Sequence, residues 1–433
     1  MLVMGDCEND GRVHREAATL AAHGFDVRVF GMASKTHGPG SSQVGAVTVE
    51  RLPATSLPQL LLKRLQRSRG SGGRRRARPG VAPGTAGGAG WRSALRGPAL
   101  RVHRPTLALS YTWHAVAAVR RWRPDIVHAH DLPTLPAAAA VAGRTLPLVY
   151  DSHELWRRRN RSGQLRPLGR SVEAVIERAL APRAAVVITV CDSIARWLGG
   201  RYRLVRDPVV LRNLPDGPAV APAADLRSLA GADQERVLLY TGRIMGGRGL
   251  ELAVGCLSSL PDDVLLVLLG YGDPLYVAGL RQLATRCGVG DRVRHIGPVP
   301  PAEVAALAAG ADMAYVVIEP VCESYRYALP NKLFEAIAAG LPVLAADLPE
   351  ITRIVQQYDV GSVFLPGACA SLRSAFDSVL AGAPRHRLAA ERAREALSWR
   401  HEQRLLVEAY ESLGSRPRPT SQQVRRGARQ GER

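Results

Sequence analysis

Residues 325–350 read YRYALPNKLFEAIAAGLPVLAADLPE, and this stretch decides the fold. Pro330 is suited to the first turn of a helix and Gly340 to its end, so the stretch predicts a helix of about ten residues. The apolar run that follows, Pro342–Ala346, is typical of a buried parallel strand. A helix that leads directly into a buried strand indicates an α/β domain with a parallel sheet.

The start of this predicted helix carries three polar side chains. Asn331 and Glu335 share one helical face, and Lys332 precedes Glu335 by three residues. A helix N-terminus has free N–H groups and a partial positive charge, so it suits an anionic ligand. We therefore expect this helix start to form half of a sugar-nucleotide site.

The same alternation of strands and helices extends outward over most of the chain. Residues 2–31 read as a short strand, a glycine-bounded loop, a helix and a second strand, and the alternation restarts at Arg236. The fold class that follows is α/β, with two doubly wound, Rossmann-like domains. No GxGxxG fingerprint is present in the first unit of this pattern, so NAD binding is not supported.

Changes in composition along the chain mark the predicted domain boundaries. We expect an N-terminal domain over residues 1–215, interrupted by a disordered basic insert at about 66–100, and a C-terminal domain over 216–395. A last helix over 396–413 is expected to pack back toward the N-terminal domain, and residues 414–433 form a disordered basic tail.

The net charge of +20 is concentrated in two segments of the 433 residues. Between Lys63 and Arg104 there are twelve basic residues and no acidic ones, and residues 414–433 add six arginines against one glutamate. One interpretation is peripheral contact with an anionic membrane; the other is a solvated, disordered insert, and the sequence favours neither. We expect no specific nucleic-acid partner, because Trp91 is the only aromatic residue within the basic runs.

Cysteine usage and hydropathy bear on localisation. The six cysteines form no CxxC pair, so a disulfide framework or zinc site is not expected, and a reducing cytosol fits. No apolar run approaches the roughly 20 residues needed to span a bilayer, and the N-terminus lacks a signal-peptide pattern. We expect a cytoplasmic protein, peripheral at the inner face of the cell membrane where the basic insert makes contact.

Candidate ligand-binding residues cluster at the predicted carboxyl ends of strands, where open α/β sheets bind ligands. In the C-terminal half, Gly242 and Arg243 follow one strand, Arg248 follows in a glycine-rich loop, and Gly272 follows the next strand. Glycines let a backbone approach a ligand, and two arginines can clamp a diphosphate. Arginines also occur on ordinary surface loops, and paired glycines in ordinary turns.

In the N-terminal half, histidines and carboxylates end two neighbouring strands. His128 and His130 lie at alternate positions of one strand, and Asp151, His153 and Glu154 end the next. The spacing has no HExxH-like helical pattern, so we expect no metal.

At this point the residues resemble a known family, the retaining glycosyltransferases of the family 4 kind, which have the GT-B fold with two domains facing across a cleft. The resemblance spans nearly the whole chain apart from the insert and the tail. It rests on six stretches: NDGRVHREAATLAAHGFDV (9–27), PDIVHAHDLPTLPAA (124–138), VYDSHEL (149–155), YTGRIMGGRGLE (240–251), LLGYGDP (268–274) and YALPNKLFEAIAAGLPVLAADLPE (327–350).

The resemblance implies a role for each matching residue. Arg243 and Arg248 would hold the donor diphosphate, His130 would lie at the reaction centre, and Glu335 would bind the nucleotide ribose. It implies no cofactor, with a nucleoside-diphosphate sugar as co-substrate and an acceptor hydroxyl on a glycan, a lipid-linked sugar or a small molecule. Further donor contacts are implied for Gly11, Gly242, Gly272, Gly297, Val299, Tyr327, Asn331, Lys332 and Leu333, and acceptor-side contacts for Asp151, His153 and Glu154.

One position departs from the family pattern. The common motif has two glutamates seven residues apart, and the first falls on Tyr327, which carries no negative charge at neutral pH. This tyrosine favours one alternative to glycosyl transfer, an inactive homologue that binds sugar nucleotides. A second alternative is a nucleotide-sugar epimerase, which can share the same two-domain fold.

Overall fold

The computed structural model of the protein describes residues 1–8, 10–60, 90–160, 167–215, 225–233, 235–300 and 303–414. Most of the predicted basic insert, the predicted domain junction and the predicted tail lie outside these described residues. Residues 90–100, which we assigned to the insert, instead form the first turns of helix α3 (Gly90–Trp122). The chain divides into two compact units, one of Met1–Asp151, Val175–Val186 and Glu411–Arg433, the other of Ser152–Ala174 and Val187–Tyr410.

A six-stranded sheet with the order β10-β9-β8-β11-β12-β13 forms the centre of the second unit. Every neighbouring pair of strands is parallel. The strand order reverses direction between β8 and β11, so the carboxyl ends of these two strands mark the topological switch point. The strands are β8 (Arg236–Thr241), β9 (Val264–Leu269), β10 (Val293–Ile296), β11 (Met313–Val316), β12 (Val343–Ala346) and β13 (Gly361–Phe364).

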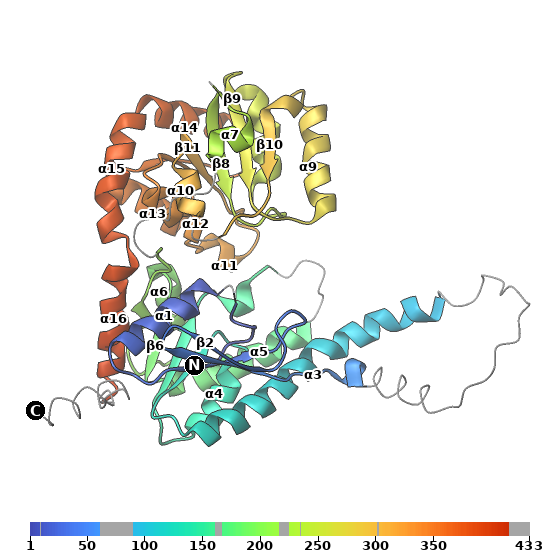
Figure 1. The fold of residues 1–433 in the computed structure, drawn as a ribbon, viewed down its shortest axis with the longest axis vertical. Helices are drawn as coiled ribbons and strands as arrows, with labels where there is room; N and C mark the ends of the chain where they lie inside the picture. The colour runs from blue at the N-terminus through green and yellow to red at the C-terminus, as the bar shows by residue number, and fades with distance from the viewer. Residues whose placement is uncertain are drawn as a thin grey trace, which may run out of the picture. The chain divides into compact units, whose positions relative to one another are not determined.

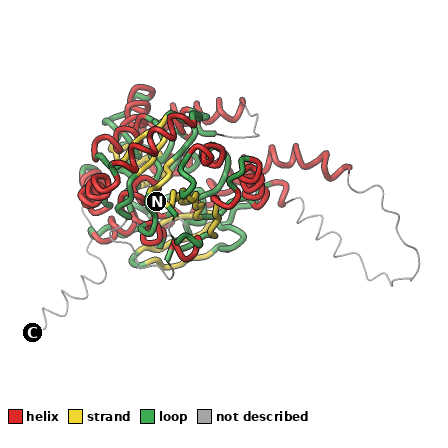
Figure 2. Tube along the Cα trace, turned by 90° about the horizontal axis from the view of Figure 1, so that it is seen from above, coloured by secondary structure: helices red, strands yellow, loops and turns green. Residues whose placement is uncertain are grey.

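Helices connect these parallel strands, and the strands lie inward of the helices (Figures 1 and 2). Strands β8, β9, β11 and β12 are almost wholly buried, which explains their near-continuous apolar sequence. The helices are α7 (Leu226–Ala230), α8 (Leu250–Cys256), α9 (Pro274–Arg286), α10 (Val304–Ala308), α11 (Glu323–Arg326), α12 (Asn331–Ala338), α13 (Pro349–Tyr358), α14 (Cys369–Ala381) and α15 (Ala383–Ala396), with short 3₁₀ turns η3 (Leu257–Ser259) and η4 (Gly290–Arg292).

The stretch that decided the fold takes the predicted form. Helix α12 begins directly after Pro330, whose backbone is extended, and the chain leaves it through Gly340 at φ +73°. Leu333, Phe334 and Ile337 are buried under the sheet, so the apolar face predicted from spacing is the packed one. Strand β12 follows at once, and the prediction of a helix leading into a buried strand is confirmed.

The strands of the first unit fall in two sheets, one of order β1-β3-β2 and one that contains β4 and β5. Leu2 bridges Phe30 on one side and Ala129 on the other, so the very short first strand lies between β1 and β4. The elements are β1 (Arg28–Met32), β2 (Gly40–Val44), β3 (Val47–Leu52), β4 (Val127–His130) and β5 (Leu148–Ser152), with helices α1 (Gly11–Ala22), α3 and α4 (Leu135–Ala142) and the 3₁₀ turn η2 (Ala181–Arg183).

Several elements of the second unit lie before the predicted junction. Strands β6 (Val186–Thr189) and β7 (Val209–Val210) pair in parallel, and helix α16 (Trp399–Glu411) contacts the chain near them. There Arg212 donates to the Glu402 carboxylate at 3.0 Å, and the Trp399 N–H donates to the Pro215 carbonyl. The remaining elements are η1 (Trp156–Arg158) and α6 (Asp192–Arg201) of the second unit, and α5 (Pro167–Leu180), whose residues from Val175 on belong to the first unit.

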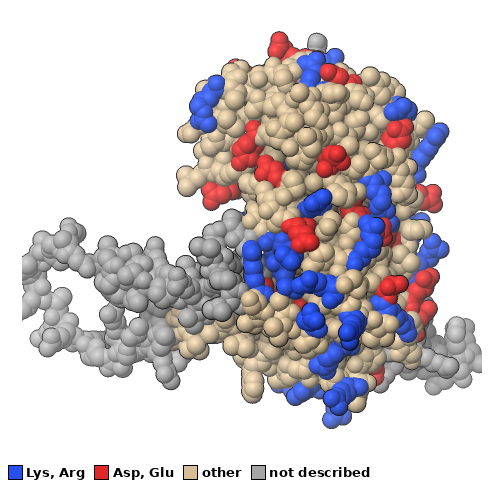
Figure 3. Space-filling view, turned by 180° about the vertical axis from the view of Figure 1, so that it is seen from behind, with Lys and Arg blue, Asp and Glu red and all other residues tan. Residues whose placement is uncertain are grey.

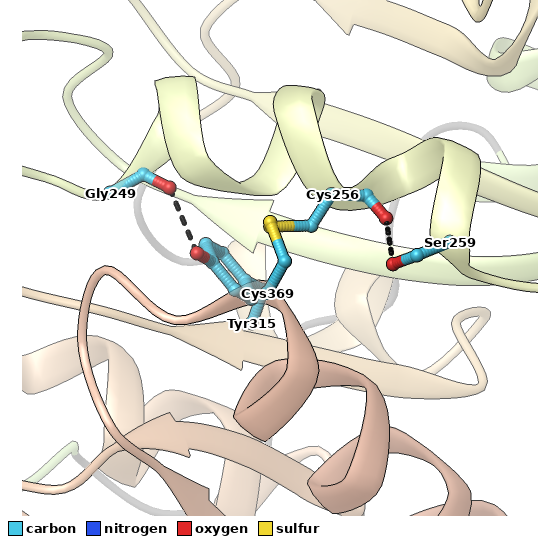
Figure 4. The surroundings of a disulfide bond; sticks show 5 residues. All are labelled: Gly249, Cys256, Ser259, Tyr315 and Cys369. Atoms are coloured by element: carbon cyan, nitrogen blue, oxygen red, sulfur yellow. Dashed lines mark hydrogen bonds between the residues drawn. A yellow bond between two sulfur atoms is a disulfide. The ribbon is translucent and has the colours of Figure 1, made fainter.

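A disulfide joins Cys256 of α8 to Cys369 at the start of α14 (Figure 4). We expected no disulfide framework, and this bond was not anticipated from the sequence. The two residues are 113 positions apart in sequence, and the sheet topology brings α8 and α14 together. A search for closely spaced cysteines, such as CxxC, does not detect such a pair. Among the helices of the described residues, none combines the length and the hydropathy that crossing a bilayer requires.

Candidate functional site

The loop after β8 is held rigidly at the switch point of the sheet. The Tyr315 hydroxyl donates to the Gly249 carbonyl at 2.8 Å, and the Glu319 N–H donates to the Gly247 carbonyl at 3.0 Å. Gly249 has φ +67°, and a Cβ there would lie 2.4 Å from a methyl of Val317. Only glycine fits this position, and its neighbour Arg248 is fixed in place as a result.

The loop after β9 packs against the loop after β8, backbone to backbone. A Cβ on Gly270 would lie 2.0 Å from the Gly242 carbonyl oxygen, and a Cβ on Gly272 would lie 2.6 Å from the Ile244 carbonyl oxygen. Gly242 itself has φ +105°. The structure therefore brings Gly242 and Gly272 together, as neighbouring loops at one sheet edge.

Three cationic side chains gather at this edge. Arg243 is exposed, Arg248 is half-buried with its guanidinium 5.3 Å from the centre of the Tyr325 ring, and the Lys332 Nζ lies 3.9 Å from the centre of the Tyr240 ring. Among the described residues, the Lys332 Nζ is shielded from solvent and has no hydrogen-bond partner. Burial, and then the nearby Arg248 charge, hold the pKa of Lys332 well below its usual range.

The side chains of α12 fall into two groups. Leu333 is fully buried in the core, so its side chain packs rather than facing a ligand. Asn331 is exposed, and its side-chain oxygen accepts from the Asn213 amide at 2.9 Å. Glu335 is half-buried one turn further on, and its charge raises the pKa of Lys332 against the larger effect of burial.

The remaining donor candidates of the second unit lie on connecting segments. Gly297 and Val299 follow β10, with Gly297 exposed. Tyr327 directly follows α11, and its carbonyl accepts from the Cys191 thiol at 3.3 Å. Glu323, one turn earlier, is engaged by the Trp197 indole at 2.9 Å and by Arg158 at 3.1 Å, so it does not supply the missing motif carboxylate.

A compact network of buried charges occupies the end of strand β4 in the first unit. Arg12 donates two hydrogen bonds of 2.8 Å to the two oxygens of Asp151 and pairs with Glu16 at 2.9 Å. His130 Nδ1 lies 3.3 Å from Asp151, and the ring of His128 stacks on the ring of His130 with centroids 4.2 Å apart. All five side chains are buried. Burial, and then the neighbouring His130, keep the pKa of His128 well below its usual value.

The backbone at His130 is fixed as firmly as the ring. Its carbonyl accepts from the Thr134 hydroxyl at 2.7 Å, and its N–H donates to Leu2. The next residue, Asp131, has φ +61°, a left-handed conformation that is rare for residues other than glycine and that occurs often at functional sites. The polypeptide is thus held in a sharp turn directly after His130.

Four side chains of this network could hold a metal ion by their spacing. Ligand atoms of Glu16, His128, His130 and Asp151 lie within 4.8 Å of one another. The Arg12 guanidinium is hydrogen-bonded to both oxygens of Asp151 and ion-paired with Glu16, so the chain itself places one positive charge beside these two carboxylates.

The other candidates of the N-terminal half lie outside this network. Gly11 begins α1 and is exposed, with the Asp10 side chain capping the helix by accepting from the Val13 N–H at 3.2 Å. In the second unit, Glu154 accepts from the Ser324 hydroxyl at 3.3 Å and pairs with Arg159 at 3.5 Å. His153 is half-buried beside it.

Sequence reasoning missed three residues that support these groups. Arg12 and Glu16 are four residues apart on α1, a spacing that predicts an ion pair, but it does not predict Asp151, which is 139 residues from Arg12. Tyr240 reads as one more apolar position of a buried strand. Its sequence position before Gly242 and Arg243 is the only signal that could have identified it.

The architecture of α/β units with parallel sheets, together with cations grouped beside a glycine loop at a switch point, defines the class of GT-B proteins. Two family models match the chain, "Glycosyl transferase 4-like domain" over residues 74–215 and "Glycosyl transferases group 1" over residues 224–396. Together they cover most of the sequence. The chain belongs to the family 4-like glycosyltransferases with the GT-B fold.

Known proteins agree with this assignment. Sucrose-phosphate synthase from Thermosynechococcus elongatus has a TM-score of 0.69 at 20% identity, covering 95% of this chain and 98% of its own. HepE of Anabaena, solved in complex with UDP-glucose, has a TM-score of 0.65 at 17% identity, covering 95% of this chain and 98% of its own. A D-inositol 3-phosphate glycosyltransferase from Xylanimonas cellulosilytica is 32% identical over 56% of this chain, and the chain spans only 60% of that relative's length.

Proposed function

We propose that the protein transfers a sugar from a nucleoside-diphosphate sugar to an acceptor hydroxyl, with retention of anomeric configuration and without a metal ion. The observation that carries the proposal is the group of Arg243, Arg248 and Lys332 at the switch point. Among the described residues, none of the three forms an ion pair with a carboxylate. Cations that the chain leaves unpaired beside a glycine loop are suited to the charge of a diphosphate.

The proposed step breaks the bond between the sugar anomeric carbon and the donor phosphate oxygen. The acceptor oxygen attacks from the same side, and its proton passes to the departing phosphate. Negative charge grows on the diphosphate as it leaves, and Arg243, Arg248, Lys332 and the N-terminus of α12 stabilise it. These groups supply the role that a divalent cation fills elsewhere, and EDTA is therefore expected to leave turnover unchanged.

For the first unit we propose an acceptor-side role, with His130 and the turn after it as its fixed part. The ring of His130 is fixed by Asp151 and by stacking on His128. A buried ring held this firmly keeps the turn after His130 in one conformation, which favours a positioning role.

A thermal-shift series with UDP, GDP, ADP and their sugar conjugates tests donor binding. A ligand at 100 times its dissociation constant adds about 2.7 kcal/mol to stability, a shift that the assay resolves. The Arg248→Ala variant is the control and is expected to lose the shift. Proton NMR of the product's anomeric centre then tests retention, and an inverted product would overturn that part of the proposal.

The finding that separates transfer from the two alternatives is the product. Slow donor hydrolysis without acceptor argues against an inactive homologue, and an unchanged sugar configuration in the recovered donor argues against an epimerase. A purified protein that binds a sugar nucleotide but neither hydrolyses it nor glycosylates any acceptor would support the inactive reading.

We also propose that helix α3 contacts an anionic membrane surface. Leu109 and Trp113, one turn apart on α3, are 69% and 77% exposed, and Arg120 and Arg121 are exposed near the end of the same helix. Basic side chains also gather in the lower part of the face shown in Figure 3. An exposed aromatic–aliphatic pair on a basic helix favours the membrane interface.

Sedimentation with vesicles tests this contact. The protein is expected to bind vesicles that contain phosphatidylglycerol and not vesicles of phosphatidylcholine alone, and Trp113→Ala is expected to weaken binding. Leu275→Ala, which removes a side chain that is 84% exposed on α9, is the matched control and is expected to change nothing.

A further inference from the structure

Tyr240 is the penultimate residue of β8 and is fully buried, yet its hydroxyl and its ring each contact a polar group. Its hydroxyl donates to the Arg243 carbonyl at 2.7 Å. The face of its ring lies 3.9 Å from the Lys332 Nζ. One side chain therefore contacts the start of the glycine loop and the start of α12 at the same time.

The ring is the group that makes the position of Lys332 tenable. A buried ammonium without a hydrogen-bond partner is costly, and a ring face offers partial negative charge in compensation. Among the described residues, the Lys332 Nζ has no hydrogen bond to share that role. A leucine at residue 240 would keep the position apolar but would leave the ammonium without compensation.

The hydroxyl has a separate purpose. Burial raises the pKa of Tyr240 to about 12, so the group stays protonated and donates at any physiological pH. Its acceptor, the Arg243 carbonyl, lies in a loop whose own residues include a glycine at φ +105°. The bond fixes the backbone from which the Arg243 guanidinium extends.

We infer that Tyr240 is a positioning residue that ties Arg243 and Lys332 together as one preset clamp for the donor diphosphate. The inference rests on the proposed function and adds to it the residue that sets the clamp. Because the Lys332 side chain and the backbone of Arg243 are placed before the ligand arrives, less ordering has to accompany binding, which strengthens affinity.

The pH dependence of nucleotide affinity reports on the charge of Lys332, and a purely structural role of Tyr240 would not affect it. The groups that act on it are Arg248 of the glycine loop, which lowers its pKa, and Glu335 of α12, which raises it, with burial the largest effect. The pKa of Lys332 in the free protein is depressed, and a bound diphosphate favours the charged form. Affinity is therefore expected to fall as pH rises through that depressed pKa, with proton uptake on binding. Lys332→Met is expected to remove this dependence.

The experiment is a double-mutant cycle in nucleoside-diphosphate affinity, measured by titration calorimetry with whichever of UDP, GDP and ADP binds the wild type most tightly. Tyr240→Phe keeps the ring and loses the hydroxyl, and is expected to weaken binding about threefold to tenfold. Tyr240→Leu loses both and is expected to weaken it by a further threefold or more. In the Lys332→Met background, the Leu and Phe variants are expected to bind equally, because the ring has no ammonium to hold.

Tyr111→Phe is the matched control for stability. The Tyr111 hydroxyl is also buried and donates to a backbone carbonyl, that of Phe30, at 2.8 Å, but it lies in the first unit away from these cations. Both Phe variants are expected to lower the melting temperature alike, and only Tyr240→Phe is expected to change affinity.

Two results would overturn the inference. The first is equal nucleotide affinity for Tyr240→Leu and Tyr240→Phe when Lys332 is present. The second is an affinity of Tyr240→Leu that stays below that of Tyr240→Phe by the same factor in the Lys332→Met background. If the wild type binds none of the three nucleotides, the proposed function itself fails and the inference with it. If the wild type binds a nucleotide but the affinity losses of the Tyr240 and Lys332 variants simply add, the inference about Tyr240 fails and the proposed function stands.

Discussion

In the first unit Arg12 is 3% exposed, and its guanidinium is bonded to two carboxylates, those of Asp151 and Glu16. In the second unit the Lys332 ammonium is equally shielded, yet among the described residues it contacts only a ring. We call the first arrangement closed, because its guanidinium is paired with carboxylates of the chain. We call the second open, because its amine has no hydrogen-bond partner among the described residues.

This difference separates a scaffold from a binding site. A buried ion pair is weak evidence of net stability, but it fixes geometry, and here the Asp151 carboxylate that Arg12 holds also contacts the ring of His130. An unpaired buried cation destabilises the free protein and is tolerated where a ligand completes it. A buried basic side chain thus holds His130 in place in the first unit, through Asp151, and is suited to bind an anion in the second.

The largest effect is expected when the closed arrangement is broken. Arg12→Met leaves the carboxylates of Asp151 and Glu16 buried without their cation, and removal of one partner from a buried pair typically costs about 3–5 kcal/mol. We expect a large fall in the melting temperature measured by circular dichroism. The matched variant is Arg51→Met, whose guanidinium pairs with the exposed Glu8 and which is expected to lose far less. Similar melting temperatures for the two variants would contradict the comparison.

Breaking the open arrangement is expected to affect turnover and not folding. Arg248→Ala removes a donor to the leaving diphosphate, and loss of one such donor costs about 3–4 kcal/mol of transition-state stabilisation, or about 10²–10³ in kcat. The melting temperature without ligand is expected to stay the same, since Arg248 makes no ion pair among the described residues. Arg286→Ala, at the end of α9, is the surface control. A rate for Arg248→Ala equal to that of the wild type would overturn the donor assignment.

Removal of the disulfide tests whether nucleotide binding by the open arrangement depends on the link between α8 and α14. Cys369→Ser removes the link between α8 and α14, and loss of a disulfide typically costs about 2–4 kcal/mol of stability. Nucleotide affinity is expected to be unchanged, because the Arg248 loop is held by the bonds from Tyr315 and Glu319. Dithiothreitol is expected to lower the melting temperature of the wild type to that of the variant. If the variant also lost affinity, the cations would depend on the cross-link.

The fold could be predicted from the sequence because its signals are local. Pro330 and Gly340 mark the ends of α12, and continuous apolar runs mark strands that are covered on both faces. The arginines of the open site were also predictable, since they follow a strand within a glycine-rich loop. Each of these patterns is contained in about ten residues of sequence.

The rest depended on contacts between distant parts of the chain. The pairing of Arg12 with Asp151 and the disulfide of Cys256 with Cys369 join residues more than a hundred positions apart. No local pattern distinguishes such partners from surface residues. Tyr240 was hidden for a different reason: an aromatic residue in a buried strand has the expected composition of a core, and only the position of the Lys332 ammonium shows a second use.

The smallest effect is expected for an ion pair with the same short distance but without burial. Arg373 and Asp377 lie four residues apart on α14 with a separation of 2.7 Å, close to the 2.8 Å of Arg12 and Asp151, but both are more than 40% exposed. Water screens such a pair and competes for both charges, so Asp377→Asn is expected to cost about 0.3–0.5 kcal/mol. The measurement is the melting temperature at low and high salt, with a difference from the wild type that shrinks as salt is added. A cost approaching that of Arg12→Met would mean that distance, and not burial, decides what these pairs contribute.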